Sequence, residues 1–362
     1  MATKDSRHTT FLRTSIKFCL ALVIVFLIFQ VGFYFLVESK QLRTIYANVE
    51  IIRNYSGRIA NKLQKNLGPA NATAMNMVVI EKTKRTDILQ DCPPIPTKLV
   101  GPLATYRHAP SIAEMEMEFK YLETGGYFSP TECRSDQRVA IVIPYRNREL
   151  HLRTLLYNLH AMLQRQQINY RIFVIEQAGN NTFNRGLLMN IGYTEAIKSD
   201  NYTCFVFHDV DLIPEDDRIY YGCGKNPRHL SAAIDKFNYR LPYGSIVGGV
   251  TQLRKDDVEK INGFSNMYFG WGGEDDDLGV RLKNAQLKIE RYSMVISRYK
   301  MLKHVKDQGN APNPNRIKLL KTAASRMKTD GVNNLKYKVL NTYRGKLFTN
   351  VTVAVTGADY AI

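Results

Sequence analysis

Phe205-Val206-Phe207-His208-Asp209-Val210-Asp211 is an apolar run that ends in two carboxylates, two residues apart. Short runs of aromatic and β-branched residues are typical of buried strands. Open α/β sheets place their ligands at the carboxyl ends of their strands, so we expect Asp209 and Asp211 to lie at such an edge. Concentrated negative charge there needs a cation, and a divalent metal that holds a diphosphate meets this requirement.

A second acidic cluster, Trp271-Gly272-Gly273-Glu274-Asp275-Asp276-Asp277, follows about sixty residues later. In it, flexible glycines and an aromatic ring precede four consecutive carboxylates. An exposed helix N-terminus, stabilised by the helix dipole, is the alternative interpretation of the four carboxylates taken alone. The two clusters together indicate sugar-nucleotide chemistry.

The residues around the first cluster follow an alternating α/β pattern. We expect strands at 138–143, 170–176 and 204–207, and amphipathic helices at 149–166 and 184–199. A strand-helix-strand order favours parallel pairing with right-handed crossovers. The chain shows no internal repeat, and its length of 362 residues with 44% hydrophobic composition allows a sizeable core.

The N-terminal part predicts a membrane anchor. Residues 18–37 form an almost unbroken apolar run, which is long enough to cross a hydrocarbon layer of about 30 Å. Basic residues dominate the segment before it, so the positive-inside rule places the N-terminus in the cytosol. We therefore expect a cytoplasmic tail at 1–17, a transmembrane signal anchor at 18–37, a stem at 38–90 and a lumenal domain at 91–362. A buried core helix or an uncleaved leader is the alternative for 18–37.

Sequons and cysteines are compatible with the secretory pathway. Asn-x-Ser/Thr triplets predict glycosylation at five positions, Asn54, Asn71, Asn180, Asn201 and Asn350. Of the five cysteines, Cys19 lies in the apolar run, which leaves four for an oxidising lumen. Four cysteines allow three pairings, and their spacing does not choose among them. No Cys-x-x-Cys is present, which argues against structural zinc.

The positive charge is concentrated near the C-terminus. The formal net charge is +17, and residues 281–350 contain 17 Lys or Arg against three acidic residues, a net of +14. Such charge is typical of a solvated face, and it also attracts anionic substrates or membrane surfaces. A nucleic-acid partner is disfavoured because a lumenal domain would not meet one.

The motifs also resemble a known family. The segments Ile143 to Arg148, Phe183 to Arg185, Phe205 to Pro214, Ile261 to Phe264, Trp271 to Asp277 and Met301 to His304 are similar, in order and spacing, to the β-1,4-galactosyltransferases, which are Golgi type II glycosyltransferases. The resemblance extends over roughly residues 91–320. It implies a GT-A type nucleotide-sugar α/β fold, dependence on Mn²⁺ and inversion at the anomeric carbon.

The resemblance also implies roles for the two acidic clusters. Asp211, Met301 and His304 match the metal ligands, and a helical-type turn could aim Met301 and His304 inward together. A carboxylate, a thioether and an imidazole suit manganese better than calcium. An isolated Met-x-x-His would be core packing or a surface histidine. Asp275 matches the base that deprotonates the attacking hydroxyl on the face opposite the nucleotide.

Other matched positions imply contacts with the substrates. The nucleotide-binding positions are Pro144, Tyr145, Arg146, Arg148, Phe183, Arg185, Asp209, Val210 and Trp271. Trp271, the single tryptophan, would swing over the bound sugar, and residues 302–322 would rearrange with it; burial in the core is its alternative. The positions for the acceptor and the sugars are Phe237, Tyr243, Gly249, Gly272, Glu274, Asp276 and Arg316. The matched cysteine pairs are Cys92–Cys133 and Cys204–Cys223.

Position 246 bears on the donor sugar. Members that transfer galactose have a tyrosine where this chain has Ile246, and an isoleucine leaves room for an acetamido group. We therefore expect UDP-N-acetylgalactosamine as the donor and terminal β-linked N-acetylglucosamine as the acceptor, as in the invertebrate-type β-1,4-N-acetylgalactosaminyltransferase branch. Transfer of galactose from UDP-galactose is the first alternative. An inactive lectin or scaffold that keeps the sugar pocket is an alternative of another class.

Overall fold

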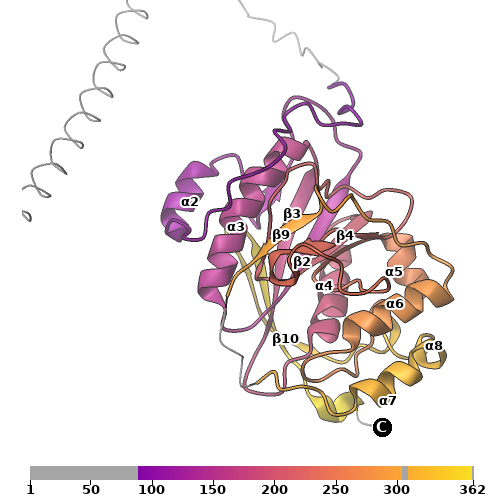
Figure 1. The fold of residues 1–362 in the computed structure, drawn as a ribbon. Helices are drawn as coiled ribbons and strands as arrows, with labels where there is room; N and C mark the ends of the chain where they lie inside the picture. The colour runs from indigo at the N-terminus through magenta and orange to yellow at the C-terminus, as the bar shows by residue number, and fades with distance from the viewer. Residues whose placement is uncertain (1–88, 304–308, 361–362) are drawn as a thin grey trace, which may run out of the picture. The chain divides into compact units, whose positions relative to one another are not determined.

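The computed structural model describes residues 89–303 and 309–360 (Figure 1). The chain divides into two units, Met1–Arg85 and Thr86–Ile362, and the described residues belong to the second. The expected tail, anchor and most of the stem, the sequons at Asn54 and Asn71, and the expected metal ligand His304 lie outside the described residues. Within 89–303 and 309–360, no helix has both the length and the apolar composition to cross a membrane.

A mixed eight-stranded sheet forms the centre of the described unit. Its strand order is β10-β11-β3-β2-β4-β8-β6, with β1 also paired to β3. The strands are β1 (Tyr127–Phe128), β2 (Arg138–Tyr145), β3 (Asn169–Gln177), β4 (Cys204–His208), β6 (Arg228–His229), β8 (Val250–Arg254), β10 (Lys338–Arg344) and β11 (Thr349–Ala354). Strands β3, β2 and β4 are parallel, whereas β4 and β8 are antiparallel.

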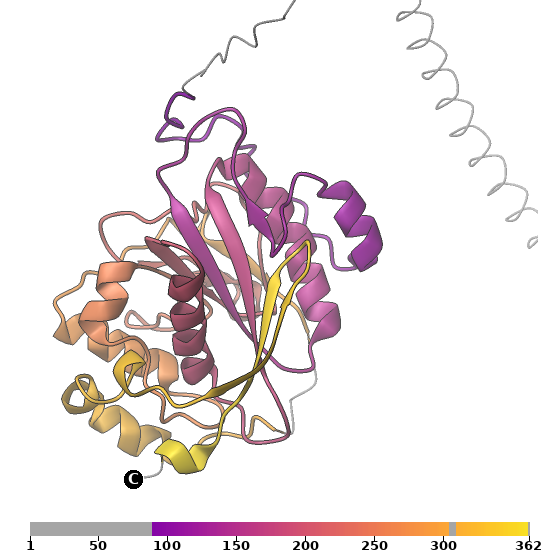
Figure 2. The ribbon, with the colours of Figure 1, turned by 180° about the vertical axis from the view of Figure 1, so that it is seen from behind.

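Helices cover both faces of this sheet (Figures 1 and 2). The described α-helices are α2 (Ile112–Glu118), α3 (Glu149–Leu163), α4 (Arg185–Ser199), α5 (Lys255–Ile261), α6 (Glu274–Asn284), α7 (Arg316–Lys321) and α8 (Ala323–Arg326). Successive side chains of a strand point to opposite faces. In β2, Val139 and Ile141 therefore pack in one core cluster with α3, while Ala140 and Val142 pack in the other with α4.

The sequence predicts the centre of the sheet correctly and misses its edges. All three expected strands and both expected helices are present, with the parallel pairing that their order indicates. The expected helix at 149–166 ends as a short 3-10 turn, Gln164–Gln166. The antiparallel strand β8 and the C-terminal hairpin of β10 and β11, which adds β11 parallel to β3, were not expected.

A second, three-stranded sheet lies next to the carboxyl end of β4. It consists of β5 (Leu212–Pro214), β7 (Ala233–Ile234) and β9 (Arg298–Met301), in the order β5-β9-β7. Leu212 is directly opposite Met301, and the Leu302 amide donates a hydrogen bond of 2.8 Å to the Asp211 carbonyl. Two segments about ninety residues apart are thereby held side by side.

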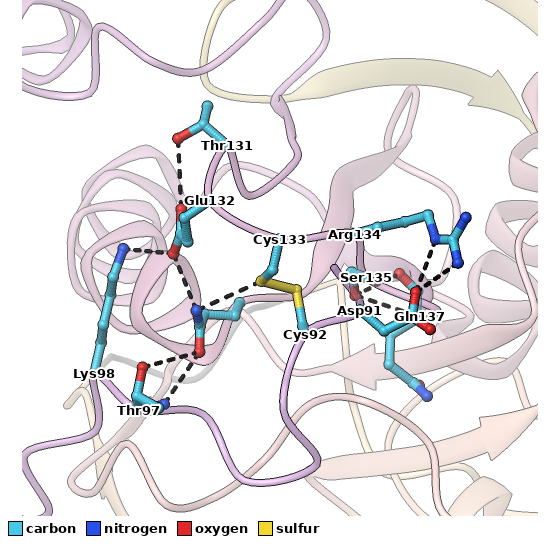
Figure 3. The surroundings of a disulfide bond; sticks show 11 residues. Asp91, Cys92, Thr97, Lys98, Thr131, Glu132, Cys133, Arg134, Ser135 and Gln137 are labelled. Carbon is cyan, nitrogen blue, oxygen red and sulfur yellow. Dashed lines mark hydrogen bonds and ion pairs between the residues drawn. A yellow bond between two sulfur atoms is a disulfide. The ribbon is translucent and has the colours of Figure 1, made fainter. Parts of the chain in front are cut away.

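The described residues contain two disulfide bonds, Cys92–Cys133 and Cys204–Cys223, which are the pairs that the resemblance implies. Cys92–Cys133 ties the start of the described unit to the loop before β2, beside an ion pair of 2.7 Å between Arg134 and Asp91 (Figure 3). Cys204–Cys223 links the first residue of β4 to the segment before β6. Either bond stabilises the fold by about 2 to 4 kcal/mol.

The described sequons differ in their surroundings. Asn180 and Asn201 are exposed. Asn350 lies in β11, where its side-chain amide donates to Glu176 Oε2 at 3.0 Å and to Thr352 Oγ1 at 3.1 Å. The glycosylation of all five sequons stays a prediction.

Candidate functional site

Two adjoining cavities lie beyond the carboxyl end of β4. The smaller has a volume of about 240 Å³ and the larger about 450 Å³. Both are lined by Asp209, Gly249, Trp271, Glu274 and Asp275. The two acidic clusters of the sequence therefore meet at one site, in the position where α/β sheets bind ligands.

Asp211 and Met301 come together through the pairing of β5 with β9. Asp211 lines the smaller cavity and Met301 lines the larger one. Met301 is the last residue of a strand, so the expected helical-type turn is wrong at this residue; pairing with β5 holds it extended. A carboxylate beside a thioether is a donor set that fits a manganese-type ion better than calcium.

The described part of the chain does not contain a group of three or more His, Cys, Asp or Glu side chains arranged to hold a metal ion. The expected third ligand, His304, falls in the gap between the described ranges. The fit of the site to a metal therefore depends on Asp211 and Met301.

The base candidate Asp275 is in the first turn of α6. This helix starts after Gly273, whose φ of 99° lies in the left-handed region that glycine adopts most easily. Four carboxylates, Glu274 to Asp277, occupy the first turn, where the helix dipole favours negative charge. A Cβ at position 248 would overlap the Asp275 carboxylate, so Gly248 permits close packing of its loop on the base.

Arg185 connects the two acidic clusters. Its Nε donates to Asp209 Oδ1 at 2.5 Å, and its Nη1 is 3.6 Å from Glu274 Oε1. Burial alone would lower the pKa of Arg185, but the carboxylates of Asp209, Glu274 and Asp275 raise it. The guanidinium is therefore a fixed positive charge between the two acidic clusters of the site.

Burial weakens the acidity of the carboxylates. Burial raises the pKa of Asp209 to about 6, helped by Asp211 and opposed by Arg185. Burial and the charge of Asp275 raise the pKa of Glu274 to about 7. The pKa of Asp275 is also raised, first by burial and then by Asp276. Such shifts at a cavity are typical of functional sites.

Glu274 has an unused acceptor. Its Oε2 is buried and has no hydrogen-bond partner among the described residues. An unsatisfied buried oxygen is costly unless a ligand supplies a donor, so this atom marks a place for a ligand hydroxyl.

The remaining expected nucleotide positions line the smaller cavity, with one exception. Pro144, Arg146, Arg148, Phe183 and Val210 are all present there. Arg146 also lies over the Phe183 ring, 5.1 Å from its centroid.

Tyr145 is the exception. It lines a separate cavity of about 350 Å³ and packs against the core cluster that includes α3. The alternation along β2 explains this difference, because Tyr145 points to the same face as Ile141 and Ile143.

The larger cavity collects every expected acceptor-side residue. Its lining includes Phe237, Tyr243, Ile246, Gly249, Gly272, Glu274, Asp276 and Arg316. The Tyr243 hydroxyl donates to Asp276 Oδ1 at 2.8 Å. Trp271 is 60% exposed at this cavity, so it is not an ordinary core residue, and Arg316 lies 5.7 Å from its ring centroid.

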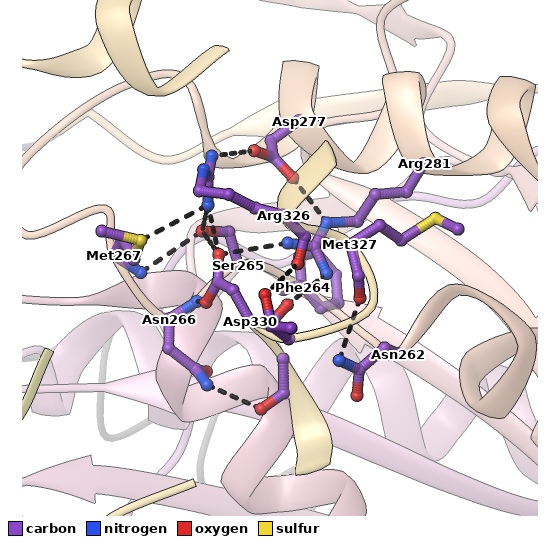
Figure 4. A network of polar contacts seen from close by, with 12 residues as sticks. Asn262, Phe264, Ser265, Asn266, Met267, Asp277, Arg281, Arg326, Met327 and Asp330 are labelled. Carbon is purple, nitrogen blue, oxygen red and sulfur yellow. Dashed lines mark hydrogen bonds and ion pairs between the residues drawn. The ribbon is translucent and has the colours of Figure 1, made fainter. Parts of the chain in front are cut away.

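A buried ionic network supports the start of α6 (Figure 4). Asp277 accepts hydrogen bonds from Arg281 Nε at 2.6 Å and from Arg326 Nη2 at 2.9 Å. Both arginines also pair with Asp330, and Arg326 donates to the Leu319 carbonyl of α7 at 2.8 Å. The network thus fixes the helix that carries Asp275 to the C-terminal helices.

Sequence reasoning missed three residues behind the larger cavity, namely His229, Gly248 and Arg291. His229 and Gly248 line the cavity, while Arg291 is bonded to the loop that forms its wall. Gly248 lies two residues after Ile246 in no motif of its own, and Arg291 falls in the basic C-terminal region, where no local pattern distinguishes it. These three residues reach the site only through tertiary packing, which the sequence pattern does not reveal.

Two family profiles match the described unit. Residues 92–224 match the profile described as the N-terminal region of glycosyl transferase group 7. Residues 228–305 match the profile described as the N-terminal domain of galactosyltransferase. The two matches contain both acidic clusters.

Curated relatives and solved structures show the same likeness. The chain is 46% identical to β-1,4-galactosyltransferase 2 of Cricetulus griseus over 270 residues, 74% of this chain and 73% of that protein. It is 45% identical to β-1,4-galactosyltransferase 1 of Mus musculus over 289 residues, 80% of this chain and 72% of that protein. The catalytic domain of Drosophila β-1,4-galactosyltransferase 7, solved with xylobiose, superposes with a TM-score of 0.53 at 27% identity, over 61% of this chain and 94% of that one. A mutant of that Drosophila enzyme, solved with manganese, UDP-Gal and xylobiose, gives a TM-score of 0.52 at 26% identity, over the same shares of the two chains.

Proposed function

Because the chain belongs to the β-1,4-galactosyltransferase family of glycosyltransferases, we propose that it transfers a sugar of galactose type from a UDP donor to terminal β-linked N-acetylglucosamine, with inversion. The observation that carries this proposal is that Asp275, on α6, and Asp211, after β4, both line the smaller cavity, while Asp275 also lines the larger one. This arrangement supports a base and a cation site that come from different elements and share one site.

The smaller cavity would bind the nucleotide. Arg146, Arg148 and Arg185 line it, and their guanidinium groups suit the phosphate oxygens of a diphosphate. Asp211, Met301 and His304 would hold Mn²⁺, in agreement with the manganese in the solved Drosophila relative. Bound there, the ion would stabilise the negative charge on the leaving diphosphate.

The larger cavity would bind the acceptor. The Asp275 carboxylate accepts the proton of the attacking hydroxyl as that oxygen bonds to the anomeric carbon and UDP departs from the opposite face. One displacement of this kind inverts the configuration and needs no enzymic nucleophile. Glu274 Oε2 would accept a hydrogen bond from a sugar hydroxyl, and Trp271 would cover the sugar and exclude water.

Galactose is the first candidate for the donor sugar. The relatives above are galactosyltransferases by name, and the Drosophila structure contains UDP-Gal. The comparisons therefore favour galactose over the expected N-acetylgalactosamine.

N-acetylgalactosamine is the second candidate, and one observation favours it. Ile246 lines the larger cavity at the position where galactose-transferring members have a tyrosine. An aliphatic side chain there leaves space for an acetamido group. Residue 246 is therefore the place where the two candidates make different predictions.

A donor comparison tests both candidates. Initial rates with UDP-galactose and UDP-N-acetylgalactosamine would be measured on one N-acetylglucosamine acceptor with Mn²⁺, for the wild type and Ile246→Tyr, and the linkage determined by NMR. The first candidate predicts a wild-type preference for UDP-galactose. The second predicts the opposite preference, reversed toward galactose in Ile246→Tyr. Undiminished transfer after chelation of the metal, or a product that lacks a β-1,4 linkage, would contradict the proposal as a whole.

We also propose that the protein is a single-pass type II membrane protein of the Golgi, with its catalytic unit in the lumen. The apolar run at 18–37, with basic residues before it, supports this topology. The two disulfide bonds of the described unit fit an oxidising compartment. Its partners would be the UDP-sugar, the glycan acceptor, on glycoprotein or glycolipid, and the membrane, with no role for nucleic acid.

A further inference from the structure

The loop from Tyr243 to Gly249, here called the 243–249 loop, forms one wall of the larger cavity. Ile246 and Gly248 line the cavity from this loop, and Gly248 packs on the Asp275 carboxylate. The loop also approaches α6 at Gly279, where an added Cβ would come within 3.0 Å of the Ser245 carbonyl oxygen. A shift of this loop would therefore change both the space beside Ile246 and the surroundings of the base.

Arg291 holds the loop through two of its backbone carbonyls. Its Nη2 donates to the Gly244 carbonyl at 2.9 Å and to the Ile246 carbonyl at 2.8 Å. Its Nε donates to His229 Nδ1 at 3.1 Å. All three acceptors are neutral, so the guanidinium acts here as a planar set of hydrogen-bond donors.

His229 extends this contact to the next carbonyl of the loop. Because its Nδ1 accepts from Arg291, the proton of the neutral ring is on Nε2, which donates to the Gly248 carbonyl at 2.9 Å. Burial, together with the charge of Arg291, lowers the pKa of His229 to about 4, so the ring stays neutral at physiological pH.

The backbone around Arg291 is fixed independently of the loop. The Glu290 amide donates to the Pro227 carbonyl at 2.8 Å, and the His229 amide donates to the Glu290 carbonyl at 2.9 Å. These bonds set the segment before Arg291 beside β6, so its side chain reaches the loop from a rigid base.

We propose that Arg291, acting directly and through His229, is a positioning residue that sets donor selectivity by fixing the 243–249 loop at Ile246. Three hydrogen bonds from one planar group define where the Ile246 backbone lies, and thus how much space its side chain leaves at the cavity. This inference rests on the proposed function, since it concerns selection between UDP-galactose and UDP-N-acetylgalactosamine.

Lysine is the informative substitution at this position. An ammonium group keeps the positive charge but does not have the planar fork that reaches two carbonyls and an imidazole together. Arg291→Lys should therefore loosen the loop while the fold is retained. Arg228→Lys is the matched control, because Arg228 bonds to Gln252 and Tyr292 in the same region.

The test is the ratio of kcat/KM for the two donors, measured on the full chain with Mn²⁺ and an N-acetylglucosamine acceptor. A looser wall discriminates less, so Arg291→Lys should move the ratio toward one by about fivefold. Arg228→Lys should leave the ratio unchanged. Arg291→Met removes both the charge and the hydrogen-bond donors, so it should move the donor ratio at least as far as Arg291→Lys. The Tm of each variant shows whether the fold is retained.

The possible failures are distinguishable. A wild type that transfers neither sugar would refute the proposed function. Two outcomes would refute the positioning role alone. In the first, the wild type is active but its kcat/KM is equal for the two donors. In the second, Arg291→Lys lowers total activity and Tm but leaves the donor ratio unchanged. A ratio that moves equally in Arg228→Lys would also refute it, since the effect would not be specific to the loop.

Discussion

Asp275 both stabilises the start of a helix and lines the larger cavity. The four carboxylates after Gly273 lie in the first turn of α6, where the helix dipole favours them, and three of them also line the larger cavity. The structural and functional interpretations of this cluster are therefore compatible. The fourth, Asp277, is fully buried and belongs to the ionic network instead.

The raised pKa of Asp275 gives a prediction on pH dependence. The base must be ionised, so activity falls as the pH drops through its pKa. Because the charge of Asp276 contributes to the rise, Asp276→Asn should lower the pKa of Asp275 and move the acid limb of kcat/KM to lower pH. The pH profile of kcat/KM measures this shift, independently of any loss in its maximum.

Asp256→Asn is the control for this experiment. Asp256 is exposed on α5, and its substitution should leave the acid limb in place. An acid limb that stays fixed in Asp276→Asn, or that moves to higher pH, would contradict the assigned coupling.

At the scale of elements, the hydrophobic periodicity of the sequence predicted the helices and strands whose formation depends on nearby residues. The strands and helices between 138 and 207 have clear periodicity, and they form as expected. Strand β10 was missed because all seven of its residues are exposed, so it has no buried face to produce an alternating pattern. Tyr145 was misplaced because the side of a strand on which a motif residue lies depends on the alternation, not on the motif.

The ion pairs that support the site could not be predicted from the sequence, because they join residues far apart in the chain. Arg326 and Asp277 are 49 residues apart, and no local signal pairs them. The residues of the two cavities, in contrast, were mostly identified because they occur in compact motifs.

The ionic network of α6 and α8 gives a prediction on stability. Removal of Arg326 leaves the two buried carboxylates of Asp277 and Asp330 with Arg281 as their remaining cation in this network, so Arg326→Met should lower the free energy of unfolding by about 3 kcal/mol. Urea denaturation of the folded unit measures this change. Arg134→Met, at an exposed ion pair, should have little effect. Equal losses for the two variants would contradict the importance of the buried network.

At the scale of the whole molecule, the division after Arg85 separates the predicted anchor and most of the predicted stem from the unit that contains both cavities. A secreted chain that begins at Thr86 should therefore keep its kcat/KM on a soluble acceptor within about twofold of the full chain. Loss of activity in a folded protein of this length would contradict the division.

A shorter chain that begins at Thr97 is the matched comparison. It lacks Cys92 and leaves Cys133 unpaired, so it should be less stable by about 2 to 4 kcal/mol. Thermal unfolding of the two truncated chains, side by side, measures the difference.

The central claim is that Asp275, which lines both cavities, deprotonates the attacking hydroxyl, while Asp211 and Met301 hold the metal. The most direct test is kcat for Asp275→Asn at saturating Mn²⁺, UDP-sugar and acceptor, with UDP affinity measured in parallel by calorimetry. The account predicts a fall in kcat of about 10² to 10⁴, with UDP affinity unchanged. A kcat close to that of the wild type would contradict it.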